Sequence, residues 1–179
     1  GHRVIDLVLF DVDGVLTDGT IWMDGSGGEA IKGFNVQDGL AVALLHAHGI
    51  RCGVLSGKSS APLDARVKQL GFDVAVTGTL GKLEALVAIT AEQGISSDEV
   101  AYVGDDVVDL PLAGIVGRFY APSDAHPVVL AAADVVLNRP GGRGVAREAA
   151  EHVLAARGLS LQDMYRPLVE TMTSSHVVQ

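Results

Sequence analysis

The chain has 179 residues, 48% of them hydrophobic and 20% charged, a balance that fits a globular domain with a sizeable core and excludes a disordered chain. Its net charge of −9 and pI of about 4.9 argue against a nucleic-acid partner, whereas a small phosphorylated substrate stays compatible with local cations. No apolar run approaches the ~20 residues of a membrane span and no signal peptide opens the chain, so a cytoplasmic location is expected.

Apolar strands alternate with amphipathic helices along the chain, separated by polar or glycine-rich turns. Strands are predicted at residues 4–10, 50–55, 74–76, 100–103, 119–121 and 135–137, and helices at residues 39–48, 63–70, 82–91, 128–132 and 145–157. Asp38 is expected to cap the first helix, and the turn at residues 24–29 predicts a hairpin within residues 20–34. Cys52, the only cysteine, lies in the strand at 50–55 and is expected to be a buried, unreactive thiol.

This order predicts an α/β, Rossmann-like three-layer sandwich with a mostly parallel sheet and no separate cap domain. One domain is expected over residues 1–179, with the hairpin as a flap after the first strand and a tail at about 158–179. In the tail, Ser160 and Asp163 resemble a helix-capping pair before a short amphipathic helix.

The chemically distinctive residues fall where the predicted strands end. They are Asp11 and Asp13 after the first strand, Ser56 after the second, Lys82 at the start of the helix that follows the third, and Asp105 and Asp106 after the fourth. Ligands of open parallel sheets bind outside the carboxyl ends of the strands, so these side chains are expected to converge.

Acidic side chains that converge repel one another unless a cation lies among them, and carboxylate oxygens suit Mg²⁺. Asp11 and Asp105 are the expected metal ligands, together with the backbone carbonyl of Asp13. Asp106 and Asp109 are expected to orient those ligands from behind.

A phosphate monoester fits the remaining donors. Ser56 offers a hydroxyl and, with Gly57, backbone N–H groups, while Lys82 supplies a full positive charge. Asp11 is the predicted nucleophile and would form an aspartyl-phosphate, while Asp13 would protonate the leaving group and later deprotonate the attacking water. Each signal alone has a structural explanation, such as a turn or a helix cap, but together they favour a phosphatase.

Four segments, residues 11–17, residues 55–57, Lys82 and residues 104–109, resemble the motifs of the haloacid dehalogenase-like phosphatase superfamily. A narrower resemblance, to the 3-deoxy-D-manno-octulosonate 8-phosphate phosphatases, is carried by residues 18–19, 34–39, 125–127 and 141–144. It implies a Mg²⁺-dependent sugar acid phosphatase, with the nine-carbon acylneuraminate or ketodeoxynonulosonate 9-phosphates as alternative substrates.

The intervals between Asp11, Ser56 and Lys82 are too short to hold a cap domain, so something else must cover the site. The hairpin carries four large apolar residues, more than a free hairpin should expose: Ile21, Trp22, Met23 and Ile31. The family resemblance implies a homotetramer in which each hairpin helps to close a neighbour's site; the alternative is a hairpin folded onto its own subunit.

Some positions depart from the octulosonate phosphatases, which usually carry Arg at Gln37, often Arg at Lys58 and commonly Thr at Ser56. Arg143 is a candidate for binding the substrate carboxylate, although it would equally serve to terminate a loop. A receiver-like phosphoacceptor module and an inert assembly domain are the other candidate functions. The order of the acidic motifs disfavours the first, and the complete set of site residues disfavours the second.

Overall fold

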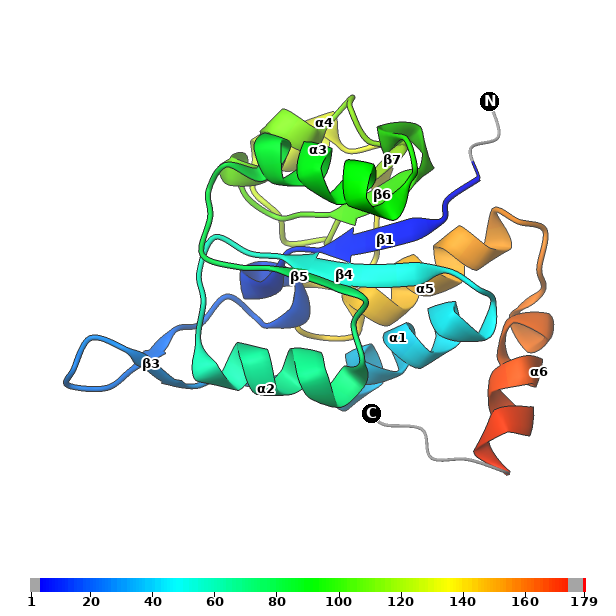
Figure 1. The fold of residues 1–179 in the computed structure, drawn as a ribbon, viewed down its shortest axis with the longest axis horizontal. Helices are drawn as coiled ribbons and strands as arrows, with labels where there is room; N and C mark the ends of the chain where they lie inside the picture. The colour runs from blue at the N-terminus through cyan, green and yellow to red at the C-terminus, as the bar shows by residue number, and fades with distance from the viewer. Residues whose placement is uncertain (1–3, 174–178) are drawn as a thin grey trace.

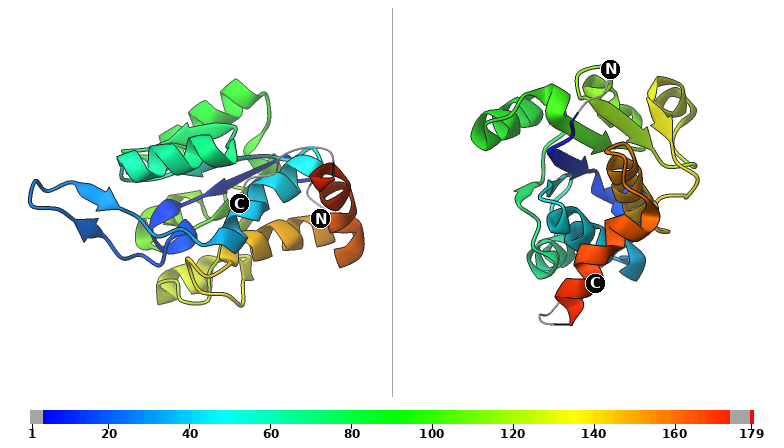
Figure 2. Two further views of the ribbon diagram at one scale, coloured as in Figure 1. Left: turned by 90° about the horizontal axis from the view of Figure 1, so that it is seen from below. Right: turned by 90° about the vertical axis from the view of Figure 1, so that its right-hand side faces the viewer.

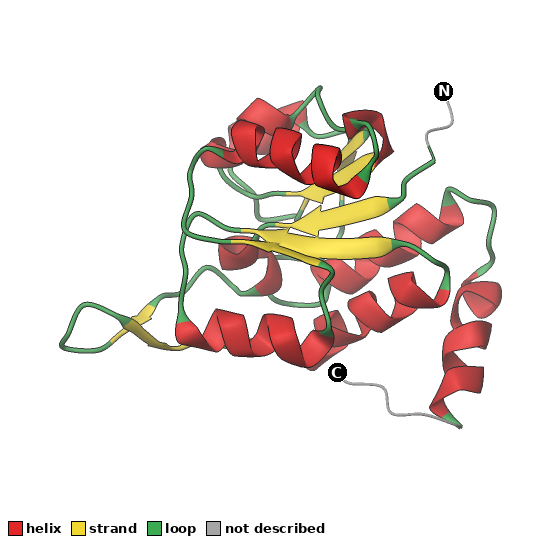
Figure 3. Ribbon diagram, viewed as in Figure 1, coloured by secondary structure: helices red, strands yellow, loops and turns green. Residues whose placement is uncertain are grey.

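Six parallel strands form the central sheet in the part of the chain that the computed structural model describes, residues 4–173 and 179 (Figures 1 and 3). The strands are β1 (Leu7–Phe10), β4 (Arg51–Leu55), β5 (Val74–Val76), β6 (Val100–Val103), β7 (Arg118–Ala121) and β8 (Val135–Val136). Across the sheet they follow the order β5-β4-β1-β6-β7-β8, and every neighbouring pair is parallel. Counted along the chain this is the Rossmann order 3-2-1-4-5-6, whereas receiver domains use 2-1-3-4-5. The predicted fold class is confirmed, and the receiver-like hypothesis is excluded.

Helices cover both faces of the sheet (Figure 1). One face carries α1 (Val36–Ala47), α2 (Ala61–Leu70) and α5 (Val145–Ala155), and the other carries α3 (Lys82–Gln93), α4 (Pro127–Ala132) and the 3₁₀ turn η3 (Val107–Leu112). A further helix, α6 (Leu161–Met172), packs on α1 and α5. The remaining short helical turns are η1 (Val12–Leu16) and η2 (Ser97–Glu99).

The four central strands, β4, β1, β6 and β7, are buried on both sides, which explains their nearly continuous apolar sequences. Along β1, Val8 and Phe10 join the core beneath α1 and α5, while Leu7 and Leu9 join the core beneath α3. Two separate cores therefore fix the orientation of each strand end, and with it the residues that follow.

Asp38 does not cap α1, contrary to the prediction. Asn35 does so, because its side chain accepts the Gln37 N–H at 2.8 Å, and the helix begins three positions earlier than expected. The Asp38 carboxylate lies on the buried side of α1 and caps α5 instead, accepting the N–H groups of Gly144 at 3.1 Å and Ala146 at 2.9 Å. It thereby ties α1 to the glycine-rich loop before α5.

The predicted hairpin is formed by β2 (Trp22–Met23) and β3 (Glu29–Ile31), which pair antiparallel and project past the carboxyl ends of the sheet strands (Figures 1 and 2). Its apolar side chains are open to solvent, with Trp22 at 58% and Met23 at 63% exposure. The hairpin therefore offers an uncovered apolar surface beside the strand ends.

The predicted tail helix is present as α6. Ser160 accepts the Asp163 N–H at 3.1 Å, as the capping pair predicts, and Met164 and Leu168 are buried in the core shared with α1 and α5. The end of the predicted tail, residues 174–178, lies outside the described residues. Within the described residues, no helix combines the length and the apolar character needed to cross a bilayer.

Candidate active site

The candidate site lies at the carboxyl ends of β1 and β6. Phe10 and Val103 are register partners, so Asp11 and Asp105 follow neighbouring strand ends. The strand order of the sheet changes direction between these two strands, which is where open α/β sheets bind ligands. Carboxylate oxygens of Asp11, Asp105 and Asp109 lie within 4.8 Å of one another. The structure thus brings together Asp11 and Asp105, which the sequence placed at strand ends, and Asp109, which was expected to orient them from behind.

Asp11 is held by its own turn. Its side chain is 8% exposed and accepts the Val12 N–H at 2.8 Å. Gly14 follows with φ of 88°, and a Cβ at that position would lie 1.8 Å from Oδ2 of Asp105. The turn can therefore approach Asp105 only because residue 14 is glycine.

Lys82 places an ammonium group among these carboxylates. It is the first residue of α3 and is 1% exposed, and its Nζ lies 2.6 Å from Oδ1 of Asp109 and 3.1 Å from Oδ1 of Asp11. Burial lowers the pKa of Lys82, but the charges of Asp11 and Asp109 outweigh burial and raise it above its usual value. Lys82 is therefore a fixed cation beside the predicted nucleophile.

Tyr102 is a member of the site that sequence reasoning missed. Its hydroxyl donates to Oδ1 of Asp109 at 2.5 Å and accepts from Nζ of Lys82 at 2.9 Å, entirely within the core. A tyrosine inside a buried strand must satisfy its hydroxyl, and its position two residues before Gly104 was the available signal. Tyr102 and Asp109 together hold Lys82 in place.

The residues at the centre of the site fit a divalent cation. Oδ1 of Asp105 is buried and has no hydrogen-bond partner among the described residues. A buried acceptor of this kind is expected where an oxygen coordinates a cation. Burial, with the charge of Asp109 as the next cause, raises the pKa of Asp11 well above its usual range, so these carboxylates are poorly neutralised by the protein alone. Asp11 and Asp105 offer the hard oxygen ligands that Mg²⁺ prefers.

Asp109 and Asp106 have structural roles that differ from metal coordination. Both oxygens of Asp109 are engaged, Oδ1 by Lys82 and Tyr102 and Oδ2 by the N–H groups of Asp105 and Asp106, so it supports the loop. The Asp106 carboxylate is exposed and accepts the Val107 N–H at 2.7 Å as the cap of η3. Asp109 therefore lies where the prediction put it, whereas Asp106 acts on the η3 turn.

Adding excess Mg²⁺ to the metal-free protein is expected to raise its Tm by about 5–10 °C at pH 7.5 and by much less at pH 5. Burial is the main reason that the pKa of Asp105 rises to about 6. The folded metal-free protein keeps this proton up to about pH 6, whereas an unfolded Asp loses it near pH 4, so metal-free stability falls between these values. Above pH 6 the Asp105 carboxylate is ionised and can bind Mg²⁺ directly. Below pH 6 Mg²⁺ must compete with a proton for this carboxylate. Thermal unfolding with Mg²⁺ or with NaCl of equal ionic strength measures this; equal Mg²⁺ shifts at both pH values would contradict it.

Asp13 is connected to the hairpin. Its Oδ1 lies 2.7 Å from Nζ of Lys32, whose side chain is 2% exposed and also lies 2.7 Å from Oε2 of Glu29. Lys58 extends this chain of charges, with its Nζ 3.7 Å from Oε1 of Glu29. Sequence reasoning missed Lys32 and Glu29, because no local pattern shows that a hairpin base folds back over Asp13.

Ser56 lies beyond the end of β4, next to the end of β1, and is 1% exposed. Its N–H donates to the Val76 carbonyl at 2.9 Å, which corrects the expectation that this N–H is available for a phosphate. Its hydroxyl accepts the Lys58 N–H at 3.2 Å and stays the polar group that Ser56 offers. At Gly57 a Cβ would lie 2.6 Å from Cδ2 of Leu80, so a larger residue there would have to displace the Leu80 side chain.

Arg143 lines a cleft of about 230 Å³ between the hairpin base and the loop before α5. The other lining residues are Thr17, Asp18, Thr20, Trp22, Gly33, Phe34, Asn35 and Gly142. The loop rests directly on the Asp13 turn, because a Cβ on Gly141 would lie 1.8 Å from the Gly14 carbonyl oxygen. Gln37 lines a different pocket, with Arg139 and Arg147. The exchange at Gln37 therefore lies outside the Arg143 cleft.

Comparisons with known proteins agree with this geometry. A family model of the haloacid dehalogenase-like hydrolases matches residues 36–117. The 3-deoxy-D-manno-octulosonate 8-phosphate phosphatase KdsC of Haemophilus influenzae is 42% identical over 156 residues, 87% of this chain and 86% of that protein. The cobalt-bound structure of the Haemophilus influenzae phosphatase has a TM-score of 0.86 at 40% identity, covering 92% of this chain and 96% of the other. The Moraxella catarrhalis phosphatase, solved with magnesium, phosphate and KDO, has a TM-score of 0.84 at 36% identity, covering 94% and 93% of the two chains.

Proposed function

Since the chain belongs to the 3-deoxy-D-manno-octulosonate 8-phosphate phosphatase family of the haloacid dehalogenase-like hydrolases, we propose that it hydrolyses 3-deoxy-D-manno-octulosonate 8-phosphate with Mg²⁺ as its cofactor. The observation that carries this proposal is the convergence of Asp11, Asp105 and Lys82 at the β1–β6 strand ends, with one oxygen of Asp105 unpaired. This assembly offers a nucleophile, a cation site and a fixed positive charge, which together are the requirements of phosphoryl transfer. An intact assembly of this kind argues against an inert assembly domain.

Asp11 is the nucleophile in the proposed mechanism. Its carboxylate attacks phosphorus and forms an aspartyl-phosphate, while Lys82 stabilises the negative charge on the transferring oxygens and Ser56 donates its hydroxyl to them. Asp13 protonates the leaving sugar oxygen and then removes a proton from the water that hydrolyses the intermediate. Asp11, Asp105 and the Asp13 carbonyl would hold Mg²⁺, which when bound neutralises charge on the carboxylates and the phosphate.

The ion pair between Asp13 and Lys32 bears on the acid–base step. The Lys32 ammonium lies 2.7 Å from Oδ1 of Asp13 and holds that oxygen beside the turn that carries Asp11. The carboxylate therefore keeps one position for the leaving group and for the attacking water. Residue 13 thus serves both half-reactions in the proposal.

The sugar acid is proposed to bind in the Arg143 cleft. A guanidinium pairs with a carboxylate through two parallel hydrogen bonds, and Thr17, Thr20 and Asn35 supply neutral polar groups for sugar hydroxyls. Nine-carbon acylneuraminate or ketodeoxynonulosonate 9-phosphates carry the same two end groups and are the alternative substrates.

A steady-state comparison tests the function directly. The kcat/KM for 3-deoxy-D-manno-octulosonate 8-phosphate is expected to exceed that for hexose phosphates by about 10²-fold or more, because hexose phosphates leave the polar groups of the cleft unpaired. The nine-carbon 9-phosphates, measured alongside, decide between the two sugar acid classes. Equal kcat/KM values for sugar acid and hexose phosphates would refute the substrate proposal, and no turnover of any ester with Mg²⁺ would refute the phosphatase itself.

The lid of the site is proposed to come from another copy of the chain in a homotetramer. Ile21, Trp22, Met23 and Ile31 are between 38% and 63% exposed on a hairpin that projects beside the site. A monomer gains nothing from such a surface, whereas packing it over a neighbour's strand ends would bury it and exclude water there. A cytoplasmic location stays a prediction from the sequence.

Trp22→Ala is expected to shift the protein from tetramers to smaller species and to lower kcat/KM for the sugar acid phosphate, while hydrolysis of p-nitrophenyl phosphate continues. A buried interface tryptophan is typically worth about 2 kcal/mol or more, whereas an exposed one contributes little to the fold of its own chain. Light scattering after gel filtration and steady-state kinetics measure both effects. Val87→Ala, at a residue that is 61% exposed on α3, is the matched control and should change neither. An unchanged tetramer with unchanged specificity in Trp22→Ala would contradict the shared lid.

A further inference from the structure

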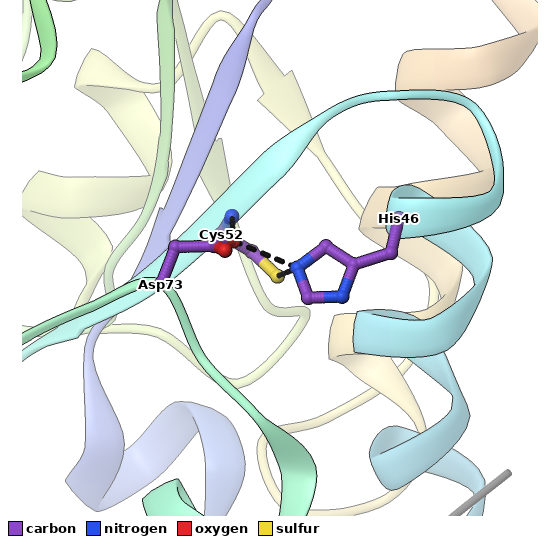
Figure 4. A group of neighbouring side chains, drawn as sticks. All are labelled: His46, Cys52 and Asp73. Atoms are coloured by element: carbon purple, nitrogen blue, oxygen red, sulfur yellow. Dashed lines mark hydrogen bonds and ion pairs between the residues drawn. The ribbon is translucent and has the colours of Figure 1, made fainter. Parts of the chain in front are cut away.

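Three potential metal ligands meet at the edge of the sheet opposite the candidate active site. His46 lies in the last turn of α1, Cys52 near the start of β4, and Asp73 directly before β5. Figure 4 shows the three side chains pointing toward one another from these separate elements. His46 Nε2 lies 2.7 Å from Oδ2 of Asp73 and 3.7 Å from Sγ of Cys52, and all three ligand atoms fall within 4.8 Å of one another.

Two of the three separations can be compared with those of a tetrahedral zinc site. With Zn–S of about 2.3 Å and Zn–N or Zn–O of about 2.0–2.1 Å, the ligand atoms of such a site lie roughly 3.4–3.6 Å apart. The Cys52–His46 separation of 3.7 Å already matches this spacing. The His46–Asp73 pair at 2.7 Å would have to open by roughly 0.7 Å, a small movement for two side chains at the surface.

The cluster is not arranged as a nucleophilic triad. In a Cys–His–Asp triad the two ring nitrogens contact different partners, whereas here the same nitrogen, Nε2 of His46, faces both the sulfur and the carboxylate. Convergence on one point is the geometry that a cation requires. The carboxylate also lies close to the cysteine, because Oδ2 of Asp73 accepts the backbone N–H of Cys52 at 2.9 Å.

We propose that His46, Cys52 and Asp73 form a second metal site, which binds one divalent cation of the zinc type with solvent completing the tetrahedron. Binding forms a metal–sulfur bond and releases the thiol proton to solvent. Thiolate and imidazole ligands select zinc-like cations, while the all-carboxylate group at Asp11 and Asp105 selects hard cations, so the two sites are chemically distinct.

Access to the site runs from the surface. The side chains of His46 and Asp73 are 37% and 33% exposed, while Cys52 is buried behind them. Burial raises the pKa of the Cys52 thiol far above its usual value, and the charge of Asp73 raises it further. Both causes act against a bare thiolate, and the positive charge of a cation bound beside the sulfur would offset them.

Cobalt titration tests the proposal in the whole protein. With excess Mg²⁺ present to occupy the carboxylate site, one equivalent of Co²⁺ is expected to produce a sulfur-to-cobalt charge-transfer band in the near ultraviolet. Cys52 is the only cysteine, so this band can arise only from the proposed site. One equivalent of Zn²⁺ should then displace the cobalt and abolish the band.

Variants give the proposal its controls. Cys52→Ser should abolish the band, and His46→Gln and Asp73→Asn should each weaken cobalt binding by about 10-fold or more. His48→Gln, on the same helix end but hydrogen-bonded to the Met164 carbonyl, is the matched control and should keep the band and the affinity. Phosphatase activity with Mg²⁺ should be the same in wild type and His46→Gln. Absence of the band in wild type, or a band of equal affinity in His46→Gln and Asp73→Asn, would overturn the second site.

Discussion

Replacing Asp11 with asparagine is expected to lower kcat for phosphate monoester hydrolysis by about 10⁴-fold or more. An amide has nearly the shape of a carboxylate, so the hydrogen bond from the Val12 N–H and the packing of the turn should survive. The amide oxygen is a far weaker nucleophile, and no aspartyl-phosphate can form. Steady-state kinetics measure the loss, and intact-protein mass after rapid quenching should show one added phosphoryl group in wild type but not in the variant.

Asp106→Asn provides the matched control, because it makes the same exchange at the same edge of the sheet. Asp106 caps η3 from an exposed position, so the variant should lose about 1 kcal/mol or less and keep most of its activity. Wild-type turnover in Asp11→Asn would exclude Asp11 as the nucleophile, and an equal loss in both variants would exclude a specific role for it.

Replacing Lys82 with methionine is expected to lower the free energy of unfolding by about 3–5 kcal/mol and kcat by about 10²–10³-fold. Methionine fills much of the same volume but leaves the carboxylates of Asp11 and Asp109 buried without their cation. Removing one partner of a buried ion pair costs far more than removing an exposed one. Urea unfolding gives the stability, and kinetics with saturating Mg²⁺ give the activity.

The pH dependence of this loss identifies its cause. An unpaired buried carboxylate has a raised pKa, so the folded Lys82→Met protein gains a proton as the pH falls and regains part of its stability. The difference from wild type should therefore be smaller at pH 5 than at pH 8. Lys68→Met, on the exposed face of α2, should cost less than 1 kcal/mol at either pH. A loss in Lys82→Met that matches the Lys68→Met loss would contradict the ion-pair account.

Much of the fold could be predicted from the sequence, because the four central strands are buried on both faces and therefore read as short apolar runs. The predicted strand at residues 100–103 coincides with β6, while the first strand begins three residues later than predicted, at Leu7. The capping role of Asp38 was mistaken because a carboxylate near a helix start can cap either its own helix or a neighbour. Only the packing of α1 against α5 decides between them.

The site residues also divide into those that the sequence predicts and those that only the packing of the fold brings together. Asp11, Asp105 and Lys82 could be placed because each stands at the end of a predictable element. Lys32 contacts Asp13, 19 positions away, and Tyr102 contacts Lys82, 20 positions away, and no local spacing encodes those contacts. The cluster of His46 and Cys52 with Asp73 was missed for the same reason, since it joins three elements only after the sheet has formed.

The glycines of the loop before α5 have a consequence for which molecules the enzyme can accept. Because Gly141 and Gly142 allow that loop to rest on the turn that follows Asp11, the proposed nucleophile and the Arg143 loop are joined by direct backbone contact. A ligand that binds Asp11 through its phosphate and Arg143 through its carboxylate must therefore match the distance between these two residues. The enzyme would then select sugar acid phosphates by the distance between their phosphate and carboxylate groups.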